Sequence, residues 1–302
     1  GNQMTKNIFK TLGILIIIFL ILSASYIVNL FLMKPLSMDH YLAKELVVEL
    51  IDSPEAMTYV GIFDRFSWLT KHSSKLSIPT ENDRNEDISE LEDRLKILQS
   101  YDINKLSDIQ KTTREIAIFD TKNNLKNKKE FYYHDFPLNQ IGGIHLSTVE
   151  FLNSMHPIRN LSEANALIDR AFQIKAVFEG TRESLERQAE IGIYPPDFVY
   201  DHVLEQLTSF IEYTDEEHPL FTQFDRKIQE INLTNEDRSM LKDNLKNAIR
   251  TSVTPGFQLL LDFMTEKRIL ANKNDGVWSL PKGDDYYEPV SYTHLTLPTM
   301  LP

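Results

Sequence analysis

The 302-residue sequence contains no cysteine and only 10 glycines. The absence of cysteine excludes disulfides, iron–sulfur clusters and zinc sites built on thiolates. The scarcity of glycine disfavours a sheet rich in tight turns, so helix is the better expectation. Basic residues are also scarce, since 32 Lys and Arg stand against 44 Asp and Glu, which gives a net charge of −12. Because phosphate binding needs clustered Lys and Arg, we expect no nucleic-acid partner.

One long stretch near the start carries no formal charge. It runs from Leu12 to Met33 and follows Lys6 and Lys10. At 1.5 Å per residue the stretch is about 33 Å long, enough to cross a hydrocarbon core of roughly 30 Å. The lysines before it place residues 1–11 in the cytoplasm and the bulk of the chain outside. A cleaved signal peptide is the alternative, because Ser23-Ala24-Ser25 supplies the small residues of a cleavage site.

The other end of the chain does not resemble part of a domain. Val290 to Thr299 reads VSYTHLTLPT, a decapeptide that the transposase adapter of sequencing libraries encodes in one reading frame. We therefore interpret residues 290–302 as translated adapter and not as native protein; a natural β-hairpin tail is the alternative. The extracytoplasmic body then spans residues 34–289 and is incomplete at its C-terminus.

Apolar residues recur at helical spacing along the first half of this body. The ranges Met38–Ile51, Glu86–Tyr101 and Leu106–Phe119 show this spacing. Two polar stretches, Ser73–Asp87 and Thr121–Glu130, lack it and predict loops.

The second half of the body has clear helix boundaries. Ser162 is predicted to cap a helix that runs to Gly192, and Pro195-Pro196 to open the next one. Thr234, with an approximate capping box, and Thr254-Pro255 predict two further helix starts. The sequence therefore predicts an all-α fold, mainly helical with little strand, in which an N-terminal transmembrane helix precedes a truncated body.

No common catalytic motif is present, because the sequence contains no His-Glu-x-x-His, glycine-rich phosphate loop or Gly-x-Ser-x-Gly. We assign no catalytic residue and no metal ligand. Asp201, His202 and Glu205 lie together on one predicted helix and could share a metal, although a solvated polar face explains them equally well. His145 and His156 flank a short apolar helix and are interpreted as structural histidines.

Three segments resemble a known family. They are Phe136 to Pro196, which contains the glycine pair of FPLNQIGGIHL; Pro255 to Leu270; and Gly276 to Tyr287, which reads GVWSLPKGDDYY. These segments resemble the bacterial domain-of-unknown-function 885 family, and the likeness covers most of the chain from residue 38 to 289. The resemblance implies a helical protein similar to zinc-dependent peptidases of the helical carboxypeptidase type.

In such peptidases a later helix carries a His-Glu-x-x-Pro-Gly-His signature. Its histidines ligate zinc, and its glutamate activates the bound water. The sequence stops before such a helix would begin. The resemblance therefore implies zinc and catalysis for a full-length parent, and no cofactor in this chain.

The substrate-cleft candidates are Gly142, Gly143, Gly283, Tyr286 and Tyr287. Paired glycines permit close backbone approach or a positive φ, which is the physical reason for considering Gly142 and Gly143. An ordinary turn is the alternative explanation of the pair. For Gly283 and the tyrosines, the alternative is a turn that closes onto a core of aromatic rings.

These observations predict the N-terminal fragment of a membrane-anchored, extracytoplasmic, zinc-peptidase-like protein whose zinc-binding half is missing. The alternative is a non-catalytic helical binding or scaffold protein of the cell envelope. The expected partners are membrane lipid, through Leu12 to Met33, and peptides for the full-length protein. If the N-terminal segment is cleaved, the protein is secreted instead.

Overall fold

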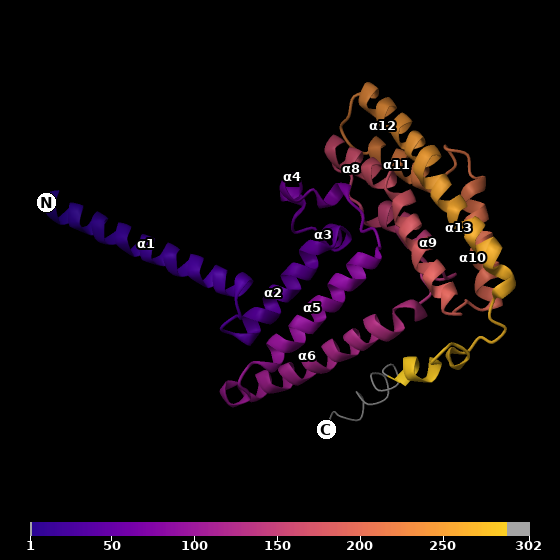
Figure 1. The fold of residues 1–302 in the computed structure, drawn as a ribbon. Helices are drawn as coiled ribbons and strands as arrows, with labels where there is room; N and C mark the ends of the chain where they lie inside the picture. Colours follow the sequence, from indigo (N-terminus) through magenta and orange to yellow (C-terminus); the bar gives the residue numbers. More distant parts are fainter. Residues whose placement is uncertain (1, 289–302) are drawn as a thin grey trace. The chain divides into compact units, whose positions relative to one another are not determined.

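The computed structural model describes residues 2–288, apart from the side chains of residues 2–9 and of Phe66. Within residues 2–288 no β-strand forms, and a single isolated parallel bridge joins Pro196 to Asn272. The all-α prediction is confirmed (Figure 1). The segment interpreted as adapter, residues 290–302, lies outside the described residues.

The chain divides into two compact units, which are described separately. Among the described residues, unit 1 comprises residues 2–52 and 91–122, and unit 2 comprises residues 53–90 and 123–288. The elements of unit 1 are α1 (Asn2–Leu32), α2 (Met38–Asp52), the end of α5 (Glu81–Gln99), η3 (Ile103–Lys105) and most of α6 (Asp108–Lys126).

The N-terminal helix α1 matches the predicted apolar segment. Its stretch Lys10–Leu32 has a mean hydropathy of 2.6 and is long and apolar enough to cross a membrane. None of that stretch is buried in the structure. An apolar helix with no buried side chain along this stretch is what a bilayer or a translocation signal requires.

The rest of unit 1 packs around a small core. Its buried apolar side chains belong to Met38, Tyr41, Leu98, Tyr101 and Ala117. The Tyr101 hydroxyl donates a hydrogen bond to the carbonyl oxygen of Pro35 at 2.9 Å. Since Pro35 lies in the connection between α1, which ends at Leu32, and α2, this bond fixes the chain just after the apolar helix.

Unit 2 holds the larger core and the remaining elements. They are α3 (Pro54–Val60), η1 (Asp64–Phe66), α4 (Ser67–Thr70), η2 (His72–Ser74), the start of α5, η4 (Asn127–Phe131), η5 (Tyr132–His134), α7 (Ile144–Glu150), η6 (Phe151–Met155), α8 (Leu161–Ala171), α9 (Ile174–Glu190), α10 (Asp197–Glu212), α11 (Pro219–Gln229), α12 (Asn235–Ala248), η7 (Ile249–Val253), α13 (Thr254–Lys267), η8 (Arg268–Leu270) and η9 (Val277–Ser279). Three of these, η4, η6 and η7, are single π-helical turns.

Helix α13 lies at the centre of unit 2, between α9 and α10 (Figure 1). Phe257 of α13 meets Phe178 of α9 edge to face at 5.2 Å and stacks on Phe210 of α10 at 4.6 Å. Gly256 allows the close approach, because a Cβ there would lie 3.1 Å from the Phe178 ring. Aromatic pairs at these separations add to the stability gained from burial.

Several predicted helix boundaries are confirmed. Helix α10 begins directly after Pro196, and Gly192 adopts a left-handed φ of +79° just beyond the end of α9. Thr234 caps α12, since its hydroxyl oxygen accepts a hydrogen bond from the Asp237 amide at 3.0 Å. These boundaries follow from local side-chain chemistry, which the sequence contains in full.

The single helix predicted from Ser162 to Gly192 is wrong. The chain breaks between α8 and α9, and Asn160 is the N-cap residue of α8 in place of Ser162. Ser252 stabilises the break, because its hydroxyl donates to the Phe172 carbonyl at 2.8 Å and accepts from the Lys175 amide at 3.1 Å. Both backbone groups would otherwise be unsatisfied.

Helix α13 begins at Thr254, as the Thr254-Pro255 pair predicts, but no break in the chain precedes it. The chain stays helical from α12 through the π-turn η7 into α13. Proline lacks an N–H and normally interrupts a helix, but here Pro255 occupies the first turn of α13 directly after the wide π-turn. That same turn carries Ser252.

Neither polar stretch predicted as a loop is fully one. Helix α5 begins at Glu81, within Ser73–Asp87, and α6 with η4 remains helical across Thr121–Glu130. Thr80 and Asp83 form a reciprocal capping box, with amide-to-side-chain bonds of 3.2 and 3.0 Å. The capping box at Thr80 thus starts α5 inside a stretch whose polar composition predicts a loop.

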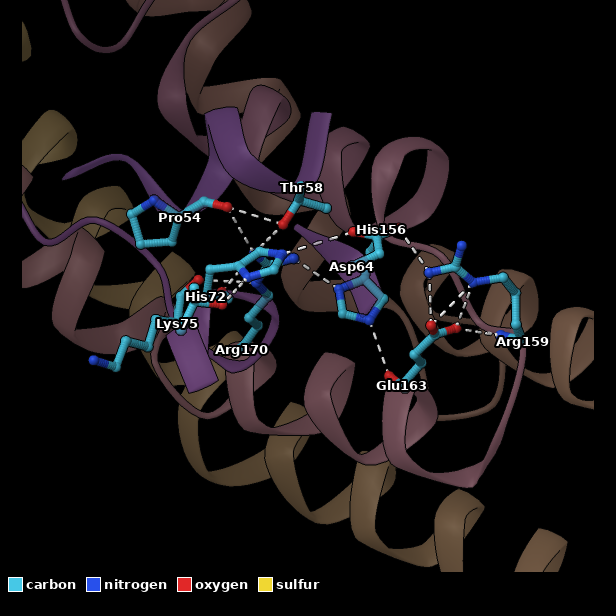
Figure 2. A network of polar contacts seen from close by, with 10 residues as sticks. Pro54, Thr58, Asp64, His72, Lys75, His156, Arg159, Glu163 and Arg170 are labelled. Carbon is cyan, nitrogen blue, oxygen red and sulfur yellow. Dashed lines mark hydrogen bonds and ion pairs between the residues drawn. The ribbon is translucent and has the colours of Figure 1, made fainter. Parts of the chain in front are cut away.

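A fully buried arginine joins α8 to the segment from α3 to η2 (Figure 2). The Arg170 guanidinium donates hydrogen bonds to the carbonyl oxygens of Lys75 at 2.8 Å and His72 at 3.0 Å. It also donates to the Thr58 hydroxyl oxygen at 2.7 Å and to His156 Nδ1 at 2.8 Å. Burial lowers the pKa of Arg170 to about 10, so the guanidinium remains charged near neutrality.

Replacing Gly180 of α9 with alanine is expected to destabilise unit 2 by about 1–3 kcal/mol. A Cβ at this position would lie 2.2 Å from the Pro79 carbonyl oxygen. In an open mid-helix site the same change stabilises by roughly 0.5–1 kcal/mol, so the sign of the effect tests the contact. Urea denaturation followed by circular dichroism measures it, and equal or greater stability of Gly180→Ala would show that the contact is absent. Gly13, which has open space around it, is the control.

Candidate functional site

Two cavities lie side by side in unit 2 and share Asp135, Phe136 and Tyr286. The larger one, of about 530 Å³, has walls of aromatic, amide and hydroxyl side chains. They come from Pro79, Asn124, Asn127, Lys128, Phe131, Tyr132, Tyr133, Asp135, Phe136, Pro137, Ile144, Thr181, Ser184, Gln188 and Tyr286. The smaller one, of about 200 Å³, lies between His134 and the chain from Asn272 to Leu280.

Tyr286 forms part of the wall between the two cavities. Its hydroxyl donates a hydrogen bond to Asp135 Oδ1 at 2.6 Å, and its ring lies 5.1 Å from that of His134 and 5.7 Å from that of Phe131. Burial, together with the Asp135 carboxylate, raises the pKa of Tyr286 above its ordinary value. The phenol is therefore protonated at any physiological pH and acts as a fixed donor to Asp135.

His134 presents a buried acceptor at the smaller cavity. Its Nε2 lies 2.7 Å from the Pro281 carbonyl oxygen, which can only accept, so Nε2 carries the proton. In the neutral ring Nδ1 is then an acceptor, and no hydrogen-bond partner in the described part of the chain reaches it. A buried acceptor without a partner is costly unless water or a ligand satisfies it.

The larger cavity holds a second unsatisfied acceptor. Asn127, in the π-turn η4, lines this cavity, and its Oδ1 is buried with no hydrogen-bond donor among the described residues. Gln188 uses both amide hydrogens on the carbonyl oxygens of Tyr133 at 2.7 Å and Asp135 at 2.8 Å. Thr181 and Ser184 donate their hydroxyl hydrogens back to α9. The walls therefore offer acceptors and aromatic faces, which suits a ligand that carries N–H donors.

Of the five predicted substrate-cleft residues, the structure places Tyr286 in the walls of both cavities. Gly283 closes the turn before it, since its amide donates to the Leu280 carbonyl at 2.9 Å and a Cβ would lie 2.0 Å from the Val277 oxygen. Tyr287 is half exposed and lines neither cavity.

The glycine pair lies in the turn that leads into α7. Asn139 Oδ1 accepts a hydrogen bond from the Gly142 amide at 2.9 Å, and a Cβ on Gly143 would lie 2.6 Å from the Asn139 backbone. Neither glycine lines either of the two cavities. Close approach of the Asn139 backbone thus explains why glycine is needed at position 143. A role of the pair in a substrate cleft stays a prediction.

The other singled-out polar residues lie apart from these cavities. Asp201 binds Arg268, with Oδ1 2.8 Å from Nη2, and within residues 2–288 no three His, Asp or Glu side chains gather closely enough to hold a metal. His156 uses both ring nitrogens, one toward Arg170 and one 2.9 Å from the Glu163 carbonyl oxygen. His145 contacts Gln206 through Nε2 at 2.9 Å. Both histidines are buried in the core, as interpreted from the sequence.

Sequence reasoning missed His134, Asn127, Asp135 and Gln188. No motif marks them, because their role depends on which distant backbone groups fold against them. The Tyr-Tyr end of GVWSLPKGDDYY was the available signal, since Tyr286 joins these residues to the quoted motif.

Comparisons with known proteins agree with the family resemblance. A family model described as "Bacterial protein of unknown function (DUF885)" matches residues 54–301. That range includes residues 290–301, whose origin as adapter stays a prediction. No curated protein matches the chain significantly.

A solved structure shares the fold. It is described as "The crystal structure of the putative lipoprotein from Colwellia psychrerythraea" and matches with a TM-score of 0.69 at 18% sequence identity. The match covers 82% of this chain but 45% of that one. This chain therefore spans less than half the length of the structure it resembles.

Proposed function

The chain belongs to the DUF885 family of bacterial proteins, and on that premise we propose that it is the membrane-anchored N-terminal part of a zinc-dependent peptidase of the cell envelope. In this proposal unit 2 supplies one wall of the peptide-binding cleft. The apolar helix α1 and the fold shared with a lipoprotein support the envelope location. The 45% coverage of that longer structure supports the view that further chain completes the fold.

The observation that carries the proposal is the pair of buried, unpaired acceptors at the two cavities. His134 Nδ1 and Asn127 Oδ1 each lack a donor among the described residues. A peptide backbone carries N–H donors at regular spacing, and aromatic walls accommodate its apolar side chains. Both atoms are shielded from water in the free protein, so a peptide would reach them as the cavity walls adjust, and each hydrogen bond would then contribute about 0.5–1.5 kcal/mol.

Zinc does not fit the described residues, because no group of three His, Asp or Glu side chains lies together in residues 2–288. We therefore assign no zinc-dependent step to them. In the proposal the zinc ligands and the catalytic glutamate lie in the further chain of the parent protein. The residues of this chain bind and orient the peptide.

The longer protein encoded by the parent gene is expected to cleave a quenched fluorescent peptide, to lose this activity to a chelator and to regain it with zinc. In that protein Asn127→Leu should raise KM roughly 2- to 10-fold with little change in kcat, because it removes one hydrogen bond to bound peptide. A parent protein that cleaves no peptide in the presence of zinc would favour the non-catalytic scaffold function.

Asn153→Leu is the matched control. Asn153 also lies in a π-turn and also has a buried, unpaired Oδ1, but it lines neither of the two cavities. Any general effect of removing a buried amide from a π-turn should appear in both variants. An equal rise of KM in both would remove the support that Asn127 gives to the proposal.

A further inference from the structure

A short segment of unit 2 exposes an unusual amount of apolar surface. Five side chains between Tyr59 and Leu69 are largely in solvent: Tyr59 (73% exposed), Val60 (49%), Ile62 (63%), Trp68 (74%) and Leu69 (66%). They occupy the end of α3, the following turn and α4, and are called here the Tyr59–Leu69 surface. Exposed apolar side chains gathered in so short a segment point to an interaction site.

The base of this surface is held firmly to the core. Arg170 binds the chain before it, at the Thr58 hydroxyl, and the chain after it, at the His72 and Lys75 carbonyls (Figure 2). Gly61, with a left-handed φ of +69°, ends α3 and turns the chain. Both ends of the segment are therefore fixed to the core, which limits the entropy lost when a partner binds.

The charges on the projection are mainly positive, in contrast to the acidic chain. Its single acidic residue, Asp64, is bound by Arg159, with 2.7 Å between Oδ2 and Nη2. Arg65 and Lys71 are exposed, whereas the chain as a whole has a net charge of −12. Exposed Trp and Tyr beside aliphatic and basic side chains are the composition of a surface that binds the interface of an anionic bilayer.

The surface follows α1 closely in the sequence. Helix α1 is apolar and long enough to cross a bilayer, and only α2 and two short connections separate it from α3. A second contact with the same bilayer is then intramolecular and needs little affinity of its own.

We propose that the Tyr59–Leu69 surface inserts into the headgroup region of the bilayer that α1 crosses, as a second, peripheral membrane contact. The occupant is lipid, and the aromatic and aliphatic side chains reach the acyl boundary while Arg65 and Lys71 contact anionic headgroups. This contact orients unit 2 against the membrane and is independent of any peptidase activity.

The two tryptophans of the chain provide a matched test. Trp68 and Trp278 are equally exposed, at 74% and 73%, but only Trp68 belongs to the surface. The full chain is reconstituted into vesicles of phosphatidylethanolamine and phosphatidylglycerol with brominated acyl chains. Trp278→Phe leaves Trp68 as the reporter, and Trp68→Phe leaves Trp278.

Brominated lipid should quench Trp68 emission roughly twofold, since interfacial side chains insert about 5–10 Å. The emission of Trp278 should be unchanged by bromine, and aqueous iodide should quench it more than that of Trp68. Equal bromine quenching of the two tryptophans would overturn the proposal. Protection of Trp68 from iodide without bromine quenching would also overturn it, because it would indicate a protein partner.

A second pair of variants tests the surface itself in the Trp278→Phe background. Leu69→Asp, on the surface, should abolish the bromine quenching of Trp68. Ile269→Asp, 85% exposed elsewhere in unit 2, should leave the quenching intact. Because both positions are exposed, neither change removes a core contact. Quenching that survives Leu69→Asp would contradict insertion.

Discussion

Replacing Arg170 with methionine is expected to lower the free energy of unfolding by about 3–5 kcal/mol, a larger effect than any other single substitution considered above. Methionine fills much of the volume but donates no hydrogen bond. The Lys75 carbonyl and His156 Nδ1 would then lose the Arg170 donor, and the His72 carbonyl and Thr58 hydroxyl would each lose one of their two hydrogen bonds. Each unsatisfied group costs roughly 1–3 kcal/mol, in part offset by relaxation. Urea denaturation of the full chain in detergent micelles, followed by circular dichroism, measures the loss.

Arg182→Met is the control for this substitution. Arg182 is half exposed and pairs with Glu186 one helical turn away on α9. Exposed pairs of this spacing contribute about 0.3–0.5 kcal/mol, so the control should be nearly neutral. Similar midpoints for Arg170→Met and Arg182→Met would contradict the role assigned to the buried guanidinium.

Lowering the pH from 7 to 5 is expected to destabilise unit 2 by about 3–4 kcal/mol through its buried histidines. Burial, helped for His156 by the Arg170 charge, lowers the pKa of His156 to about 3, and burial lowers that of His218 to about 4. In the unfolded chain both titrate near 6.5. The unfolded state therefore binds more protons between these values, and stability present above pH 6.5 is lost as the pH falls.

The size of this effect depends little on how low the native pKa values are. At pH 5 a histidine that stays neutral in the native state is protonated in the unfolded chain. Each such histidine lowers the free energy of unfolding by about 2 kcal/mol. Burial also lowers the pKa of His72 and His145, which act in the same direction. Urea midpoints measured between pH 7 and 5 give the slope, and a flat profile would show that these histidines are not buried as neutral groups.

His156→Gln should reduce the slope of unfolding free energy against pH by the contribution of up to about one bound proton. Glutamine can still accept from Arg170 and donate to the Glu163 carbonyl, so the hydrogen bonds of the imidazole are imitated. His202→Gln, at an exposed position on α10, is the matched control for the exchange of a histidine for glutamine.

Local chemistry made the helical fold predictable, and distant contacts set its limits. The start of α10 after Pro196 and the cap of α12 at Thr234 depend on residues next to them in the chain. The break between α8 and α9 depends on Ser252, 80 residues after Phe172. No periodicity in the sequence from Ser162 to Gly192 contains that information. The Thr80 cap of α5 is also a local signal, but the polar composition of Ser73–Asp87 led to the prediction of a loop there.

The candidate site likewise contains one residue that a local motif predicts and others that depend on distant contacts. The motif that ends in Tyr286 led to one wall of the cavities. The orphaned acceptor of His134 was not predictable, because it exists only where the Pro281 carbonyl, 147 residues away, determines which ring nitrogen carries the proton. The same holds for Asn127, which a polar stretch without periodicity placed in a predicted loop.

The three π-turns η4, η6 and η7 have a consequence for how this chain tolerates changes of length. A residue inserted into a regular α-helix rotates everything after it by about 100° and moves apolar side chains out of the core. A π-turn already contains such an extra residue, held locally within one wide turn. Gaps against relatives of different helix length should therefore collect at Asn127–Phe131, Phe151–Met155 and Ile249–Val253. There, deletion of one residue restores the α-helical repeat without turning the packed faces on either side away from the core.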